Sequence, residues 1–183
     1  MRLPTGGEET QQMESVFWLV YLTAIFQRLS ELWLARRHTR MVQAEGGYEA
    51  GKDHYRWVVC LHVGFFIALP VEVHLRSSGP SPQFFFWLGL YLIAQIVRYW
   101  AIVSLGKYWN TRIFVVSGMR RVKTGPYRFV AHPNYVAVVV ELLALPLMFD
   151  AYLTTVAASS ANALVLRRRI RVEEEALRAE TER

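Results

Sequence analysis

The side chains best suited to bind a polar ligand gather at one predicted helix start. Pro133 suits the first turn of a helix, where its missing N–H removes no hydrogen bond. His132 would then stand where this helix begins, with Asn134 and Tyr135 just inside it. The free backbone N–H groups of a helix start attract carboxylates and other polar groups, and these side chains add donors and acceptors. The segment therefore predicts a binding site for a polar ligand.

A second polar group follows the last apolar run of the chain, where Glu173 and Glu174 lie among basic residues. Two apolar runs, about 134–149 and 151–166, come before it with one acidic residue between them. This arrangement predicts a tight helical hairpin. Because the two open ends of a hairpin lie on the same side, we expect His132 and Glu173 to meet at its mouth.

Each of these features has a structural explanation when it stands alone. A His-Pro pair at a helix start is usually a cap, and Tyr127 and Tyr135 suit the interfacial aromatic belt of a membrane protein. A run of glutamates after basic residues usually lies on a solvated helix face. Their joint occurrence at one predicted place favours a functional site.

Ionisable side chains also lie inside the apolar runs, where each costs roughly 2.5–3.5 kcal/mol on insertion, so they usually face the bundle interior. Arg28 and Glu31 are three residues apart and can pair on one helix face, and Arg98 can snorkel to the headgroups. Glu141 has no cation near it in the sequence, which favours a place in a functional cavity. The full set is Arg28, Glu31, His62, Glu72, Arg98 and Glu141.

Five apolar runs must position these groups. A bilayer core about 30 Å thick needs roughly 20 mostly apolar residues for each helix, and the last two runs are shorter than that. We therefore expect one domain over residues 1–183, an all-α transmembrane bundle of about five spans that ends in a C-terminal hairpin and a charged helix. The expected spans are about 15–34, 57–75, 83–105, 134–149 and 151–166.

The basic residues predict the orientation of the bundle. Short loops rich in Lys and Arg stay in the cytoplasm, and the basic segments are 36–56, 107–128 and 167–171. Five crossings with the N-terminus outside place all three on the cytoplasmic side. A multi-pass protein with a cofactor pocket facing the cytoplasm is therefore expected.

The composition also bears on partners and metals. The formal charge of +6 lies beside apolar runs, which favours an anionic membrane surface over nucleic acid. The single cysteine, Cys60, excludes an intramolecular disulfide framework and a cysteine-based zinc cluster. We expect no metal site.

The chain resembles the isoprenylcysteine carboxyl methyltransferase family and its small bacterial members. Order, spacing and membrane setting match together over most of the chain, which is more specific than any single motif. The clearest pieces are Gly125-Pro-Tyr-Arg, His132-Pro-Asn-Tyr135 and Arg169-x-x-x-Glu173-Glu174. Weaker ones are Leu105-Gly-x-x-Trp109-Asn-Thr-Arg-Ile113, Gly46-Gly-x-Glu-x-Gly51 and His54-Tyr55.

The resemblance implies an S-adenosylmethionine pocket built from about 106–135 and 167–178. Arg169 would orient an anionic group of the acceptor. One departure is Ala131, which stands where family members usually have Arg; either a contact is missing or Arg128 supplies it. The cofactor contacts carried over by position are Tyr127, His132, Pro133, Asn134, Tyr135 and Glu173, with Arg112 and Val122 as weaker candidates.

The acceptor decides which further residues the reaction needs. A carboxylate is already ionised near neutral pH, so Arg169 alone would position it. A phenol or enol hydroxyl would benefit from a general base, for which Glu141 and His132 are the candidates. Glu141 and Arg98 are also expected to line the acceptor site.

The resemblance points first to O-methylation of an isoprenylcysteine-like carboxylate. The alternatives are alkylpyrone or alkylresorcinol hydroxyls and a lipid amine. A different class of function, a non-catalytic membrane scaffold or transporter subunit, stays open as well, although we find no internal repeats of the kind typical of transporters.

Overall fold

The computed structural model describes residues 6–118 and 122–181. Five long helices dominate this part of the chain, together with two short strands and two 3-10 turns. In order, the elements are α1 (Gly6–Ala44), β1 (Tyr48–Ala50), α2 (Lys52–Leu75), α3 (Phe84–Leu105), η1 (Gly106–Tyr108), β2 (Ile113–Val115), η2 (Gly125–Arg128), α4 (Pro133–Leu147) and α5 (Tyr152–Thr181).

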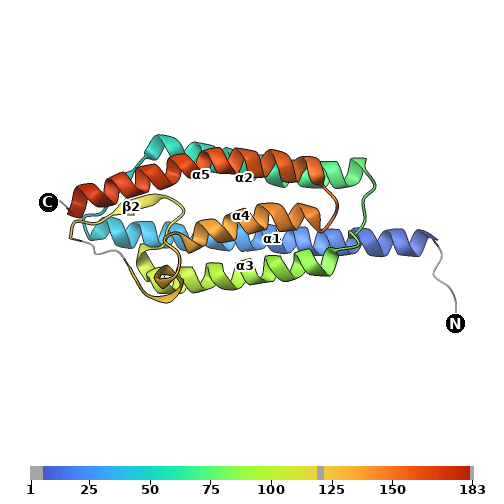
Figure 1. Ribbon diagram of the computed structural model, residues 1–183, viewed down its shortest axis with the longest axis horizontal. Helices are drawn as coiled ribbons and strands as arrows, with labels where there is room; N and C mark the ends of the chain where they lie inside the picture. The colour runs from blue at the N-terminus through green and yellow to red at the C-terminus, as the bar shows by residue number, and fades with distance from the viewer. Residues whose placement is uncertain (1–5, 119–121, 182–183) are drawn as a thin grey trace.

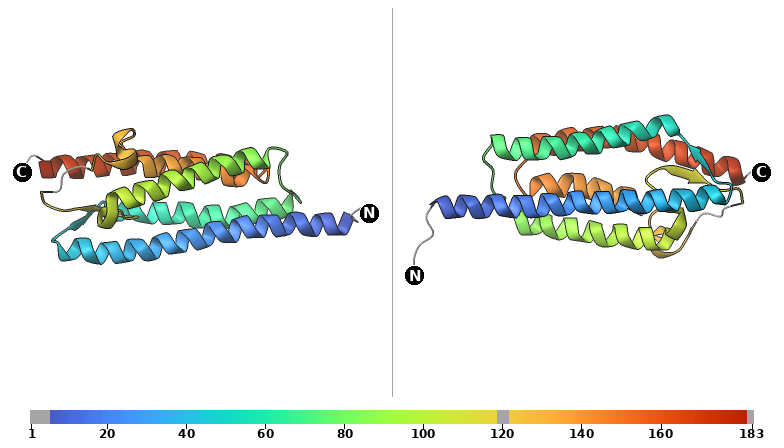
Figure 2. Two further views of the ribbon diagram at one scale, coloured as in Figure 1. Left: turned by 90° about the horizontal axis from the view of Figure 1, so that it is seen from below. Right: turned by 180° about the vertical axis from the view of Figure 1, so that it is seen from behind.

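The helices form one elongated bundle (Figure 1). α3 packs on α4, α4 on α5, and α5 on α2. Figure 2 shows α1 running along one side of the bundle over nearly its full length. Both strands, both 3-10 turns and the C-terminal part of α5 lie at one end, which we call the strand end. The described parts of the three basic segments of the sequence therefore lie at this end.

Most of the expected helices lie where the apolar runs predicted them. α2, α3 and α4 cover the runs at 57–75, 83–105 and 134–149 to within a few residues, and α5 joins the last run to the charged tail.

The loop expected from residue 36 is wrong in its first part, because α1 continues to Ala44. Residues 35–44 contain no Gly or Pro, and this stretch buries Ala35 and Val42. The helix ends at Ala44, two residues before Gly46, whose φ of 79° lies in the left-handed region typical of the residue that follows a helix.

A second difference is the pair of strands in a chain expected to be all-α. β1 pairs antiparallel with β2 through Tyr48–Val115, Glu49–Phe114 and Ala50–Ile113. A ladder of three residue pairs is too short for an alternating pattern to predict. It ties the α1–α2 connection to the segment before η2.

Two helical stretches of the described chain are long and apolar enough to cross a membrane, namely α2 and residues 84–108, and α4 is a shorter apolar helix. The outer face of α1 is also apolar, with Trp18, Phe26 and Trp33 exposed.

At the end of the bundle opposite the strands, a buried carboxylate of α2 bonds the start of α5. Glu72 of α2 accepts hydrogen bonds from the backbone N–H groups of Leu153 (3.0 Å) and Thr154 (2.6 Å) at the start of α5. These N–H groups have no partner within their own helix. Glu72 thus caps α5 and joins it to α2.

Candidate functional site

The backbone before α4 depends on a glycine. Gly125 has φ of 58° and begins η2, and a Cβ at this position would overlap the side chain of Ser104 on α3. No other residue type fits this approach without a shift. The turn that begins at Gly125 places Tyr127 among the side chains that line a cavity at the strand end.

α4 begins as its sequence predicted. Pro133 occupies the first turn and is fully buried, and the N–H of Tyr135 donates to the carbonyl of His132 at 3.1 Å. The imidazole of His132 stacks on the Tyr135 ring, with centroids 5.1 Å apart and an interplanar angle of 13°. The two side chains therefore form one flat wall.

The C-terminal part of α5 meets this wall. The Tyr135 hydroxyl donates to the carboxylate of Glu173 and accepts from Nε of Arg169 at 2.9 Å. Nδ1 of His132 lies 3.9 Å from Oε1 of Glu173, and Nε2 lies 3.6 Å from Oε1 of Glu174. The hairpin therefore brings His132 and Glu173 together at its mouth.

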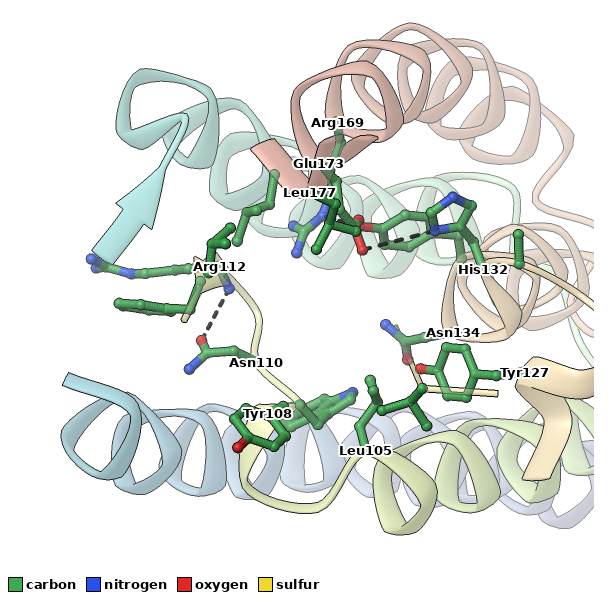
Figure 3. A pocket seen from close by; sticks show the side chains of 17 residues that line it. Leu105, Tyr108, Asn110, Arg112, Tyr127, His132, Asn134, Arg169, Glu173 and Leu177 are labelled. Atoms are coloured by element: carbon green, nitrogen blue, oxygen red, sulfur yellow. Dashed lines mark hydrogen bonds and ion pairs between the residues drawn. The ribbon is translucent and has the colours of Figure 1, made fainter. Parts of the chain in front are cut away.

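These side chains line a cavity at the strand end, which we call the polar cavity (Figure 3). Of the eight predicted cofactor contacts only Pro133 does not line it, because this side chain is buried behind the wall. Arg169, predicted to orient the acceptor, lines it too. The lining members of the predicted set are Arg112, Val122, Tyr127, His132, Asn134, Tyr135, Arg169 and Glu173.

Apolar side chains to which the sequence assigned no binding role complete the cavity. Ile113 and Val115 come from β2, and Leu177 comes from α5 beyond Glu173. The alternation of β2 points Ile113 and Val115 to the same side. A short strand could not be predicted, so this apolar surface was missed.

Arg112 is held at the edge of the cavity by two other elements. Its Nη1 donates to Glu49 of β1 at 3.1 Å, and its guanidinium lies 4.6 Å from the Tyr55 ring centre on α2. Its backbone N–H donates to the side chain of Asn110 at 3.0 Å. The strand pair thus has a role in positioning one cavity wall.

Several buried polar atoms around the cavity have no hydrogen-bond partner among the described residues. They are Nε1 of Trp109, Nε2 of His132 and Oδ1 of Asn134. Leaving a buried donor or acceptor unsatisfied costs about 1–3 kcal/mol. A bound polar molecule that satisfies these atoms would offset that cost.

The phenol of Tyr127 is kept in its neutral form. Burial raises the pKa of Tyr127, and the nearby carboxylate of Glu173 raises it further. The group therefore keeps its O–H as a hydrogen-bond donor throughout the neutral range.

Two predicted site residues lie deeper in the bundle, in a cluster that we call the charge ring: Arg28, Glu31, Arg98 and Glu141. Each guanidinium contacts both carboxylates. Oε2 of Glu31 lies 2.8 Å from Nη1 of Arg28 and 3.1 Å from Nη1 of Arg98. Glu141 pairs with both arginines. Arg98 and Glu141 are buried, at 1% and 4% exposure.

Glutamines satisfy the remaining carboxylate oxygens of the charge ring. Gln27 donates to Glu31 at 3.0 Å, and Gln95 donates to Glu141 at 2.6 Å. Glu141 does not line the polar cavity. Its cations come from α1 and α3, so its role as base or acceptor contact stays a prediction.

A second cavity, the middle cavity, lies between the polar cavity and the charge ring. It is lined by Arg28, Glu31, His62 and Arg98 on one side. It shares five lining residues with the polar cavity, namely Trp109, Asn110, Asn134, Tyr135 and Arg169.

A third space, the α1–α2 groove, adjoins the middle cavity. It holds about 380 Å³ and has an almost wholly apolar lining. Leu29, Val63 and Ile67 line it and are also more than half exposed on the outer surface. The groove and the middle cavity share Arg28, Glu31, Val58, His62 and Thr111.

The chain is similar to one family of known proteins and to two bacterial proteins. The model described as "Isoprenylcysteine carboxyl methyltransferase (ICMT) family" matches residues 87–179, a range that contains the wall of the polar cavity. The uncharacterized protein YpbQ of Bacillus subtilis is 44% identical over 165 residues, which are 88% of this chain and 96% of that protein. An uncharacterized protein of Haemophilus influenzae is 24% identical over 151 residues, 82% of this chain and 88% of its own length. No solved structure matches the chain.

Proposed function

This chain belongs to the isoprenylcysteine carboxyl methyltransferase family, and we propose that it is an S-adenosylmethionine-dependent O-methyltransferase acting on a lipophilic acceptor. The single observation that carries the proposal is the shared hydroxyl of Tyr135, which contacts both Glu173 and Arg169 at the mouth of the polar cavity. A hydroxyl from one arm of the hairpin, α4, thus joins an anion and a cation of the other arm, α5, at the same space.

The lining of the polar cavity fits the functional groups of the cofactor. S-adenosylmethionine carries an ammonium, a carboxylate, sugar hydroxyls and a flat adenine. Glu173 can accept from the ammonium or a hydroxyl, Arg169 and Trp109 can donate, and Ile113 and Leu177 offer apolar surface to the base. Oδ1 of Asn134 and Nε1 of Trp109, which have no hydrogen-bond partner among the described residues, support the same fit.

When bound, the cofactor supplies an activated methyl carbon, so the chain chiefly binds, orients and excludes water. The wall of His132 and Tyr135 covers one side of the cavity. Tyr127, whose pKa is raised by burial and by Glu173, keeps its proton and can only donate or accept a hydrogen bond.

We place the protein in a membrane with five spans, with the N-terminus outside and the polar cavity facing the cytoplasm. Three observations support this: the apolar lengths of α2 and α3, the exposed apolar face of α1, and the meeting of the basic segments at the strand end. The internal charges of α1 are paired in the charge ring, which lowers the cost of placing this helix in lipid.

For the acceptor, family membership points first to the carboxylate of an isoprenylcysteine-like lipid, oriented by Arg169. Alkylpyrone or alkylresorcinol hydroxyls and a lipid amine are the alternatives. Ala131 stands where family members usually have Arg, and the neighbouring Arg128 lies beside Phe129 and outside the polar cavity lining. Within residues 6–118 and 122–181, Arg112 and Arg169 are the guanidiniums that line it.

Calorimetric binding of S-adenosylhomocysteine to detergent-solubilised protein tests the cofactor site. Glu173→Gln should weaken binding about tenfold or more, because a hydrogen bond to a charged group contributes roughly 1.5–3 kcal/mol. Glu175→Gln, an exposed position on the same helix, is the matched control and should bind like wild type. No binding by wild-type protein at millimolar concentration would favour a non-catalytic scaffold. If wild type binds S-adenosylhomocysteine, radiolabelled S-adenosylmethionine added to membranes would identify the methylated lipid.

A further inference from the structure

His62 lies inside the bundle, and its Nε2 has no hydrogen-bond partner in the part of the chain that the structure describes. Its Nδ1 lies 2.8 Å from the carbonyl oxygen of Val58, one turn earlier on α2. A carbonyl oxygen only accepts hydrogen bonds, so Nδ1 carries the hydrogen and, in the neutral ring, Nε2 carries the lone pair.

His62 lies between the polar cavity, where the cofactor is proposed to bind, and the α1–α2 groove, which borders the outer surface of the bundle. Its side chain lines both the middle cavity and the α1–α2 groove. The middle cavity also touches Tyr135 and Arg169 of the polar cavity. An acceptor with its tail in the groove and its head in the middle cavity would place that head beside both His62 and the cofactor site.

The other basic groups near this path are engaged. The carboxylates of Glu141 and Glu31 in the charge ring each accept hydrogen bonds from two arginines and one glutamine. Glu173 receives the hydroxyl of Tyr135. His132 lines the polar cavity, next to Glu173 and Glu174, and is not part of the middle cavity lining.

We propose that His62 is a catalytic residue, the general base for an acceptor whose methylated oxygen is an ionisable hydroxyl, such as a phenol or enol on a long apolar tail. This rests on the proposed methyltransferase function and names the acceptor class of that site. Nε2 takes the hydroxyl proton. The electron pair of the acceptor oxygen forms the new bond to the methyl carbon while the carbon–sulfur bond of the sulfonium donor breaks, and its pair stays on sulfur. The imidazolium then releases the proton to water.

The charges around His62 come from every neighbouring element. The charge ring carries two positive and two negative groups, so its formal charge is zero. The titratable groups that line these spaces with His62 are Tyr21, Arg28 and Glu31 of α1, Tyr55 of α2, Tyr91 and Arg98 of α3, Tyr135 and Glu141 of α4, and Arg169 of α5.

The test compares His62→Gln with His74→Gln, the same substitution at an exposed position near the other end of α2. The probes are pentadecylresorcinol, a phenol, and N-acetyl-S-farnesylcysteine, a carboxylate. We expect wild type and His74→Gln to methylate the phenol, and His62→Gln to lose about a hundredfold or more in kcat. The loss should shrink at alkaline pH, where the phenol ionises without a base. Farnesylcysteine methylation, if present, should change little because a carboxylate needs no base.

A second readout does not depend on turnover. With S-adenosylhomocysteine bound in place of the methyl donor, the ultraviolet phenolate band of bound pentadecylresorcinol should appear at lower pH in wild type than in His62→Gln. Equal phenol methylation by wild type and His62→Gln, with equal phenolate spectra, would overturn the proposal, as would methylation of farnesylcysteine alone. Because both variants should still bind S-adenosylhomocysteine, failure of wild type to bind it would instead overturn the proposed function.

Discussion

The hydroxyl of Tyr135 donates to the carboxylate of Glu173, a residue 38 positions further along the chain. The same oxygen accepts from Nε of Arg169 at 2.9 Å. One phenol on α4 therefore fixes an anion and a cation of α5 at the mouth of the hairpin, and most residues predicted to bind the cofactor lie around it.

Removing this hydroxyl should separate the two charged groups without opening a cavity in the fold. We expect Tyr135→Phe to weaken binding of S-adenosylhomocysteine by about five- to tenfold, because a hydrogen bond contributes about 1 kcal/mol net. Calorimetry in detergent measures this. Tyr152→Phe removes a hydroxyl bonded to Asp150 at the opposite end of the bundle and should leave binding unchanged. Equal weakening by both variants would contradict the role assigned to Tyr135.

The charge ring should be more important for stability than for cofactor binding. Glu141→Ala leaves Arg28 and Arg98 with Glu31 as the one carboxylate of the charge ring between them, and breaking a buried ion pair in this way costs about 3–5 kcal/mol. A clearly lower thermal unfolding temperature in detergent is expected, whereas the exposed Glu175→Ala should unfold like wild type. Unchanged stability with lost methyl transfer would show instead that Glu141 acts on the acceptor.

The turn before α4 should tolerate no side chain at Gly125. Both Gly125 and Gly118 have positive φ, but only at Gly125 would a Cβ meet the side chain of Ser104. Gly125→Ala should therefore lower both the unfolding temperature and cofactor affinity more than Gly118→Ala does. Equal effects would mean that backbone conformation alone, rather than the approach to α3, explains the need for glycine.

Tyr127 should make the free energy of unfolding depend on pH in the alkaline range. Its pKa is raised from the usual 10.0, first by burial and then by Glu173. Below pH 10 the phenol is protonated in both folded and unfolded chains, so it adds no pH dependence. Above that value the unfolded chain loses the proton first, and the free energy of unfolding falls.

Tyr127→Phe should accordingly lose less stability than wild type as the pH rises above 10. Thermal unfolding in detergent at a series of alkaline pH values measures the difference. Parallel curves for the two proteins would show that Tyr127 titrates alike in the folded and unfolded chains.

Much of this protein follows from local sequence. The apolar runs predicted α2, α3 and α4 to within a few residues, and the His-Pro pair marked the start of α4. Helix starts and apolar lengths depend on neighbouring residues, so they can be read along the chain.

Other features were decided only by the tertiary structure. Glu141 has no cation near it in the sequence, yet it pairs with Arg28 of α1 and Arg98 of α3. The β1–β2 pair and the free nitrogen of His62 beside the middle cavity were also not apparent. These depend on which helix faces meet and at what height, and that is set by packing between segments far apart in the chain rather than by any local pattern.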